Sequence, residues 1–339
     1  MKYVSVAAIA LGLFWIDRFL AKLEQSEVQS EAAGLASTAS RLLASGNAAQ
    51  AVVDYRRAHA LVRTNRGYAL GYAQALLAAG DVSGAEATLN DQLADNSNDA
   101  PANLAMARVM VAKRNSAEAD SFYHRAIYGV WPEQAQANQQ RVRLELAQWL
   151  AGRGAKDELL AELLPIQAAA RDDPAMGHKE AELLLAAGSP ARAADQYRAL
   201  LKNNPADLAA YRGLGEAELK LGNYLGAQRA FLEAVQHEAT DVASAKRLQM
   251  LSVLVSLDPT PRRLPSAEKL ERSKRLLARV TDALAACGAT VAMKDSAKSE
   301  TAETQLNLAE QLWRANSGTC PAAQQDEPLK FVMSKLTSQ

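Results

Sequence analysis

The chain has few aromatic residues, only two cysteines and no excess of charge of either sign. Phe, Trp and Tyr make up 5% of its 339 residues, whereas apolar residues as a whole make up 49%. This composition favours helices packed through small side chains and disfavours a β-rich fold. Lys and Arg together number 38, as do Asp and Glu. Nucleic-acid binders usually carry a basic excess, so we expect no nucleic-acid partner.

Sequence motifs of catalysis and of metal or nucleotide binding are also missing. No HExxH, CxxC, GxSxG or glycine-rich phosphate loop occurs in the sequence. The four histidines stand far apart, without a Cys or acidic partner at the spacing of a metal site. We therefore expect no enzyme activity, catalytic residue, metal, cofactor or small-molecule substrate, although the C-terminal part could hold an enzyme or glycan-handling module. The histidines are His59, His124, His178 and His237.

The N-terminal residues 1–23 contain the one long apolar run, which extends from Tyr3 to Ile16 and ends at Asp17 and Arg18. The run is shorter than the roughly 20 residues that usually span a bilayer, and no small-residue cleavage site follows it. We predict an uncleaved signal-anchor, a transmembrane helix that tethers the protein with its bulk outside the cytoplasm, in the periplasm. A cleaved signal peptide, a docking helix or a buried capping helix remain alternatives, and the flanking charges leave a cytoplasmic location open.

Three fourteen-residue segments of the chain are nearly the same. They read LLASGNAAQAVVDY at 42–55, LLAAGDVSGAEATL at 76–89 and LLAAGSPARAADQY at 184–197, and the first two begin 34 residues apart. A period of about 34 residues is typical of helix–turn–helix solenoids. The whole frame follows with one insertion at 134–139. It predicts repeats at 32–65, 66–99, 100–133, 140–173, 174–207 and 208–241 and a partial one at 242–257.

Each repeat places small and large residues where the two helices of a hairpin would cross. Small side chains let helix axes approach to about 8–10 Å, and one large side chain fills the remaining space. Position 8 holds Ala39, Ala73, Ala107, Ala147, Ala181 and Gly215. Position 20 holds Ala51, Ala85, Ala119, Leu159, Ala193 and Ala227, and position 24 holds Tyr55, Leu89, Tyr123, Leu163, Tyr197 and Phe231.

A turn separates the two helices of each repeat. Position 15 is glycine except at Arg114, and glycine readily adopts the left-handed conformation that ends many helices. Position 16 is Asn, Asp or Ser except at Ala155, and these residues are preferred helix N-caps. The turn residues are Gly46–Asn47, Gly80–Asp81, Arg114–Asn115, Gly154–Ala155, Gly188–Ser189 and Gly222–Asn223.

These small, glycine and aromatic positions resemble those of the tetratricopeptide repeat family, here in a membrane-anchored protein of bacterial type. The resemblance implies an all-α fold, an α-solenoid of about six 34-residue repeats over 24–257. We expect residues 258–339 to form a helical C-terminal cap, because the last repeat of an array needs its apolar face covered; the alternative is a separate partner-docking module built on Trp313 and Phe331. We expect the insertion at 134–139 to lengthen the first helix of the fourth repeat, with a surface loop as the alternative.

The resemblance also implies a concave protein-binding groove lined by the first helix of each repeat. The amides and guanidinium of this groove suit an extended backbone, and its leucines suit side chains. Leu70 and Gln74 stand where chaperone-binding relatives have a Lys and Asn clamp, so a terminal carboxylate is not the expected ligand. Alternatively, the groove packs on the chain's own terminal helix. The groove residues are Leu70, Gln74, Leu77, Leu104, Arg108, Val111, Leu144 and Gln148.

The two cysteines, Cys287 and Cys320, both lie in the C-terminal region. They form either a disulfide, which would indicate an oxidising compartment, or two buried free thiols. Taken together, the sequence predicts a scaffold that binds an unidentified protein and helps to assemble or stabilise an envelope complex. The alternative is a structural subunit whose groove is filled by its own chain or by one obligate partner.

Overall fold

The computed structural model describes residues 2–170, 173–288 and 301–337, without the side chains of 2–14, 16–17 and 168–170. All regular elements in these ranges are helices, joined by turns and by a single parallel bridge between Asp99 and Val130. The predicted all-α fold is therefore confirmed. In chain order the elements are α1 (Lys2–Ala44), α2 (Ala48–Leu61), α3 (Arg66–Ala78), α4 (Val82–Asp95), α5 (Ala100–Ala112), α6 (Ser116–Tyr128), α7 (Ala135–Arg153), α8 (Lys156–Ala170), α9 (Pro174–Ala186), α10 (Pro190–Asn203), α11 (Leu208–Lys220), α12 (Tyr224–His237), α13 (Val242–Leu257), α14 (Ser266–Ala285), α15 (Ala302–Asn316), η2 (Ser317–Thr319), α16 (Pro321–Gln325) and α17 (Glu327–Thr337).

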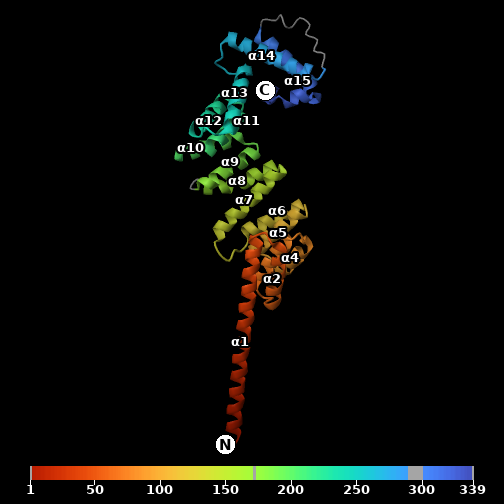
Figure 1. The fold of residues 1–339 in the computed structure, drawn as a ribbon, viewed down its shortest axis with the longest axis vertical. Coiled ribbons are helices and arrows are strands. Elements are labelled where there is room, and N and C mark those ends of the chain that lie inside the picture. Colours follow the sequence, from red (N-terminus) through yellow and green to blue (C-terminus); the bar gives the residue numbers. More distant parts are fainter. Residues whose placement is uncertain (1, 171–172, 289–300, 338–339) are drawn as a thin grey trace. The chain divides into compact units, whose positions relative to one another are not determined.

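The chain divides into two compact units, Met1–Trp149 and Leu150–Gln339. In the first unit, α1 pairs with α2, α3 with α4 and α5 with α6, and neighbouring hairpins stack on one another (Figure 1). In the second unit, α9 packs on α8 and α10, and α11 on α10 and α12. Each unit is thus a stack of helical hairpins, as expected for an α-solenoid.

The small and large positions of the repeat lie in the core of each hairpin. Ala39 and Ala51 are fully buried in the first repeat, and so are Ala181 and Ala193 in the fifth. The residue at position 24 is buried in every repeat, from Tyr55 at 9% exposed to residues that are fully buried. Burial of these side chains removes apolar surface from water, which is the main favourable term in folding.

The turn at position 15 has the same backbone conformation in all six predicted repeats. The five glycines have φ between 70° and 86°, and Arg114 has φ 59°. At the second turn Gly80 N donates to Leu77 O at 3.1 Å and Asp81 N to Leu76 O at 2.9 Å, which satisfies carbonyls that the helix end leaves open. Asp81 then accepts from Gly84 N at 2.9 Å and caps the next helix.

Position 24 of one repeat also determines the space at position 6 of the next. A Cβ atom on Gly71 would lie 2.3 Å from the ring of Tyr55, and one on Gly213 would lie 2.1 Å from the ring of Tyr197. Any larger side chain at these two glycines would therefore displace the buried tyrosine. Successive hairpins are in this way fitted to each other through a tyrosine and a glycine.

The insertion lengthens a helix. The first helices of the second and third repeats, α3 and α5, each have 13 residues, whereas α7 begins at Ala135 and has 19. The predicted extension at the start of this helix is confirmed, and the surface-loop alternative is wrong. Proline at position 132 and the left-handed Gln134, with φ 47°, come just before the helix.

Helix α1 is continuous over 43 residues, and only its C-terminal part packs on α2 (Figure 1). Further toward the N-terminus, Trp15, Phe19 and Leu20 are 67%, 62% and 56% exposed. A signal-anchor is predicted at 1–23, but in the described part of the chain no helix combines the length and the apolar character needed to cross a bilayer. The predicted transmembrane helix is therefore not supported.

The C-terminal helices cover the last hairpin of the second unit. Leu219 and Phe231 of the sixth repeat share one core with Leu251 of α13, Leu276 of α14 and Leu329 of α17. Terminal repeats of a solenoid need such a cover because no further repeat buries their apolar face. The predicted helical cap at the C-terminal end is thus present.

Lys335 fastens the last helix to the sixth repeat. Its Nζ donates to Asp258 Oδ2 at 2.8 Å and to Gly222 O at 2.9 Å, and it lies 4.7 Å from the ring centre of Tyr224. The hydroxyl of Tyr224 donates to Phe331 O at 3.0 Å. Burial of Tyr224, with the charge of Asp258 nearby, raises the pKa of the phenol, so it remains a donor at neutral pH.

A disulfide joins Cys287, at the end of α14, to Cys320, just before α16, with Cα atoms 5.6 Å apart. Cys320 is 2% exposed, whereas Cys287 is exposed. The bond closes a loop that contains α15 and η2 but not α14, with a sequence separation of 33 residues. Loop-closure entropy of this size is worth about 3–4 kcal/mol.

The left-handed turn leads to a matched pair of substitutions. Arg114→Gly should raise the stability of the first unit by about 0.5–1 kcal/mol, because glycine adopts this conformation without the steric cost of a side chain. Gly80→Ala should lower it by a similar amount, since a Cβ there meets no atom within 4 Å and only backbone strain is added. Thermal unfolding of the full chain measures both. If both substitutions shifted the unfolding temperature equally and in the same direction, the prediction would be contradicted.

Candidate functional site

The predicted groove residues all lie in the first unit, on the first helices of three successive repeats. Leu70, Gln74 and Leu77 are on α3 and are half-buried. In α5, Arg108 and Val111 are half-buried, but Leu104 is 5% exposed and belongs to the wall of the core. The remaining two, on α7, are the half-buried Leu144 and the exposed Gln148. We call these eight residues the groove face.

An apolar pocket adjoins the groove face at Leu70. Pro101 contributes from α5, and Val130 and Pro132 contribute from the segment before α7. Val130 is held in place by its backbone, because its N–H donates to Asn98 O at 2.8 Å and its carbonyl accepts from Ala100 N at 3.2 Å. Its side chain remains 66% exposed. We call this apolar pocket the Leu70 pocket. Its other lining residues are Arg66, Gly67, Gln92, Asn96 and Asp99.

The sequence-based groove omits Val130 and Pro132, because they belong to the loop rather than to a first helix. The one available signal is Trp131–Pro132 directly before the insertion. Trp131 Nε1 donates to Ala126 O at 2.9 Å and so anchors the loop on α6. A helical frame alone does not reveal that the loop turns back onto Asp99.

Arg108 is held by another residue of the chain. Its Nε and Nη2 donate to the two carboxylate oxygens of Glu145 at 2.8 Å and 2.7 Å, and Tyr123 Oη donates to Glu145 Oε1 at 3.1 Å. The three side chains come from α5, α6 and α7 and link the third repeat to the fourth. The guanidinium that we predicted to bind a ligand backbone therefore has a bidentate partner in the protein.

The polar cluster around Glu145 is stabilised by its charges. Burial alone would raise the pKa of Glu145, but the hydrogen bonds from Arg108 and Tyr123 and the charge of Arg108 outweigh burial and lower it below the ordinary value of 4.5. The hydrogen bond to Glu145 raises the pKa of Arg108 against the effect of burial. Burial and the Glu145 charge raise the pKa of Tyr123. At neutral pH Glu145 is ionised and accepts from both partners.

A related polar link joins repeats in the second unit. His178 at position 5 of the fifth repeat lies 2.8 Å from Asp207 Oδ2, and Arg212 at position 5 of the sixth donates to Asp241 Oδ2 at 2.7 Å. Both aspartates are helix N-caps: Asp207 accepts from Ala210 N at 3.0 Å, and Asp241 caps α13 in the same way. The hydrogen bond from Arg212 outweighs burial and lowers the pKa of Asp241 to about 2.

A second hollow lies beside these links in the second unit. It is lined by the largely buried side chains of Tyr197 and Phe231, and Gly213 leaves room for the Tyr197 ring. The charged walls are already paired, because Arg247 donates to Glu216 Oε1 at 2.7 Å and to Glu327 Oε1 at 2.7 Å. Further lining residues are Glu182, Leu185, Ala209, Arg212, Ala243 and Ser244.

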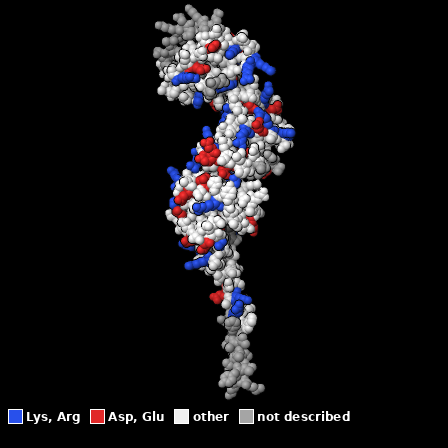
Figure 2. Space-filling model, turned by 180° about the vertical axis from the view of Figure 1, so that it is seen from behind, with Lys and Arg blue, Asp and Glu red and all other residues white. Residues whose placement is uncertain are grey.

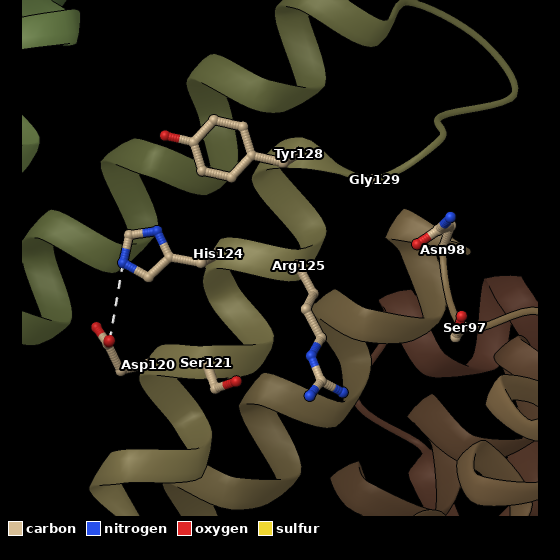
Figure 3. Close-up of a pocket in the computed structure, with 8 residues that line it drawn as sticks. All are labelled: Ser97, Asn98, Asp120, Ser121, His124, Arg125, Tyr128 and Gly129. Carbon is tan, nitrogen blue, oxygen red and sulfur yellow. Dashed lines mark ion pairs between the residues drawn. The ribbon is translucent and has the colours of Figure 1, made fainter.

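Another hollow of the first unit combines residue types that are common in catalysis. Asp120, Ser121 and His124 lie within two turns of α6, with Ser97 and Asn98 opposite (Figure 3). Figure 3 shows the imidazole turned toward Asp120, 3.7 Å from its Oδ2, while the Ser121 hydroxyl lies on the other side. This arrangement does not place a base against the serine, so it does not form a nucleophilic relay. The other residues drawn are Arg125, Tyr128 and Gly129.

Neither a metal-ligand cluster among the described residues nor a strong charge patch on the face drawn in Figure 2 marks a different site. No group of three His, Cys, Asp or Glu side chains that could hold a metal ion occurs among the described residues. Lys and Arg are interspersed with Asp and Glu over the face shown in Figure 2. The groove face and the pockets beside it are therefore the candidate binding surfaces.

A comparison with protein families identifies the repeat. Residues 42–109, which include α2 to α4 and most of α5, match the tetratricopeptide repeat model. This segment carries the tetratricopeptide repeat. A sequence comparison with curated proteins yields no match.

Several solved tetratricopeptide repeat structures are similar to the chain. YrrB, described as having an unusual peptide-binding site, shares 17% identity with a TM-score of 0.44 over 57% of this chain and 97% of YrrB. The C-terminal part of a repeat protein from Cytophaga hutchinsonii shares 11% identity with a TM-score of 0.48 over 86% of this chain and 98% of that one. The yeast Sti1 TPR2AB domain, in complex with pHSP90, shares 16% identity with a TM-score of 0.31 over 83% and 99% of the two chains.

The cluster around Glu145 predicts a pH-dependent effect of Glu145→Gln. At neutral pH the variant should lose roughly 1 kcal/mol of stability, allowing for solvent screening of the half-exposed pair. A carboxyl group with a lowered pKa in the folded state stabilises the protein above its unfolded pKa, and this contribution is lost as the pH falls through the folded value. The difference between variant and wild type should thus be constant above about pH 5 and shrink below pH 4.5, the ordinary value for Glu.

Thermal unfolding across this pH range tests the effect, with Glu24→Gln as the matched control. Glu24 is an exposed carboxylate on α1 without an ion pair in the described part of the chain, so its substitution should change little at any pH. A Glu145→Gln difference that persists unchanged to pH 3 would show that packing, and not the charge of Glu145, is responsible.

Proposed function

We propose that the protein is a non-enzymatic scaffold that binds an extended segment of a partner protein on its groove face. The observation that carries the proposal is the row of partly exposed side chains on α3, α5 and α7, which continues into the Leu70 pocket. The amides of Gln74 and Gln148 suit hydrogen bonds to a ligand backbone. The Leu70 pocket suits an apolar side chain of the same segment.

Arg108 has a different part in this proposal from the one that its sequence position suggests. Because Glu145 holds its guanidinium, Arg108 keeps α5 and α7 at a fixed spacing. Gln74 and Gln148, on either side of it, then stand on a rigid surface. Rigid placement lowers the entropy that a binding surface loses when its ligand docks.

The second candidate is a structural subunit whose groove face is permanently covered by one obligate partner or by its own chain. The half-buried leucines of the groove face favour it, since apolar side chains at a surface gain from being covered. The two candidates predict different effects of the groove face on the stability of the purified protein. A scaffold folds without its client, whereas a covered groove contributes to the stability of the purified protein.

Substitution of Gln74 and Gln148 by alanine separates the two candidates. The double variant should recover about tenfold less of the partner that co-purifies with wild type, which corresponds to about 1.4 kcal/mol. Its thermal midpoint should not change. Quantitative mass spectrometry of matched purifications measures the loss.

The matched control is Leu232→Asp, on α12 in the other unit, where the leucine is 45% exposed. It should retain the partner in full. A Gln74→Ala/Gln148→Ala protein that keeps every wild-type partner would refute binding at the groove face. A drop in its thermal midpoint together with partner loss would favour the structural subunit.

We also propose that α1 attaches the scaffold to a membrane, with the repeats outside the cytoplasm as part of an envelope complex. The apolar run at 3–16 and the exposed Trp15, Phe19 and Leu20 support the attachment. Apolar side chains with neighbouring cations such as Arg18 suit an anionic membrane surface. The disulfide supports the compartment, because such bonds persist where the surroundings are oxidising.

Flotation with vesicles of phosphatidylethanolamine and phosphatidylglycerol tests the attachment. The full chain should float with the vesicles, and Trp15→Glu/Phe19→Glu should float several-fold less because each new charge must enter the membrane interface. The control Leu225→Glu, at a leucine of α12 that is 47% exposed, should float like wild type. Equal flotation of all three proteins would exclude α1 as the attachment.

A further inference from the structure

A pocket of the first unit is lined by residues of α2, α3 and α4 and contains none of the eight groove-face residues, although Arg66 and Gln92 also line the Leu70 pocket. Its back is formed by His59 of α2 and Tyr72 of α3, whose rings stack with centres 6.4 Å apart. Two alanines complete an apolar floor beside the Tyr72 ring. We call this pocket the His59 pocket. The two alanines are Ala69 and Ala87, and the other lining residues are Arg63, Thr64, Arg66, Thr88, Asp91, Gln92 and Asp95.

Charges of both signs surround the His59 pocket without neutralising one another. Arg63 lies in the turn between α2 and α3, Arg66 is the first residue of α3, and Asp91 and Asp95 stand one turn apart on α4. None of these four exposed side chains makes an ion pair within the part of the chain that the structure describes. Two carboxylates at this spacing repel each other, so a cation between them would be stabilised.

The pocket also contains a buried acceptor without a donor. Gln92 is 7% exposed, and its Nε2 donates to Asp99 Oδ2 at 3.2 Å, which fixes the orientation of the amide. Its Oε1 is buried and has no hydrogen-bond partner, and the same is true of His59 Nδ1. Buried polar atoms are nearly always paired in folded proteins. Gln92 Oε1 is therefore an acceptor that the described part of the chain leaves open for an N–H donor.

His59 contributes little positive charge to the pocket at neutral pH. Burial lowers the pKa of the imidazole, and the nearby charge of Arg63 lowers it further against the opposing effect of Asp91. A cationic ligand group consequently does not meet a third positive charge next to the two arginines. The stacked His59 and Tyr72 rings act as a flat apolar wall.

We propose that the His59 pocket binds a small zwitterion, an α-amino acid with an apolar side chain. Its ammonium group lies between Asp91 and Asp95 and donates to Gln92 Oε1. Its carboxylate is bound by Arg63 and Arg66, since guanidinium groups bind carboxylates through paired hydrogen bonds. A simple amine would meet two uncompensated arginines, and a simple acid would meet two aspartates, so only a ligand with both charges satisfies the pocket.

The amino-acid side chain rests on the Tyr72 ring and the two alanines of the floor. This site differs from the sequence-based expectation, which includes no small-molecule ligand. It is tested separately from partner binding at the groove face, because none of its lining residues is a groove-face residue and it shares only Arg66 and Gln92 with the Leu70 pocket. The failure of either proposal leaves the other intact.

Titration of the full chain with L-leucine, L-methionine and L-phenylalanine by isothermal calorimetry tests the proposal. At least one of the three should bind, and its N-acetyl and carboxamide derivatives should bind about tenfold more weakly, since each lacks one of the two charges. The absence of binding by all three amino acids at millimolar concentration would overturn the proposal. Equal affinity of an amino acid and its N-acetyl derivative would do the same.

Substitutions that remove one charge at a time assign the site. Asp91→Asn and Arg63→Gln should each weaken binding about tenfold, with circular dichroism confirming that the variants fold. The matched controls are Asp157→Asn and Arg229→Gln, which alter exposed residues of the second unit and should bind like wild type. Wild-type affinity in Asp91→Asn and Arg63→Gln would place the ligand elsewhere and overturn the assignment.

Discussion

The close approach of paired helices is the constraint on which the rest of the structure depends. Alanine or glycine at position 8, opposite a small residue at position 20 in all but one repeat, brings the helix axes together, and a single large side chain at position 24 fills the gap. Where that side chain is tyrosine, the next repeat must leave it room. Gly71 and Gly213 do so by having no side chain, whereas Glu145 accepts a hydrogen bond from the Tyr123 hydroxyl. One local packing rule thereby extends from a hairpin to its neighbour.

Polar contacts between repeats add orientation to this apolar packing. Arg108 and Glu145 join α5 to α7, and Arg212 and Asp241 join α11 to α13. In the second pair the aspartate is also a helix cap, so the start of one repeat depends on a side chain of the previous one. Each carboxylate stays ionised beside its arginine, and loss of the arginine would leave the charge poorly compensated, most of all at the buried Asp241. Such links therefore resist sliding of one hairpin over the next.

Much of the fold could be predicted from the sequence because the repeat is a local pattern. The turn residues, the buried small positions and the longer α7 all follow from spacing within one repeat or its neighbour. The candidate site was harder to predict, since it depends on contacts that cross repeats. Arg108 has the right position for a ligand contact, but position alone does not show that Glu145, 37 residues later, holds it. Val130 likewise becomes part of a pocket only because its loop pairs with Asp99.

The same limitation explains why the His59 pocket is invisible in the sequence. Gln92 and His59 are unremarkable members of helical segments, and Asp91, Asp95 and Arg63 look like ordinary solvated charges. Only the stacked hairpin places a buried amide oxygen without a donor among two carboxylates and two guanidinium groups. Residues that pack the stack are specified by its periodicity, whereas residues that bind a ligand are free to depart from it. The atoms to examine in a repeat protein are consequently those whose hydrogen-bonding needs the repeat itself does not satisfy.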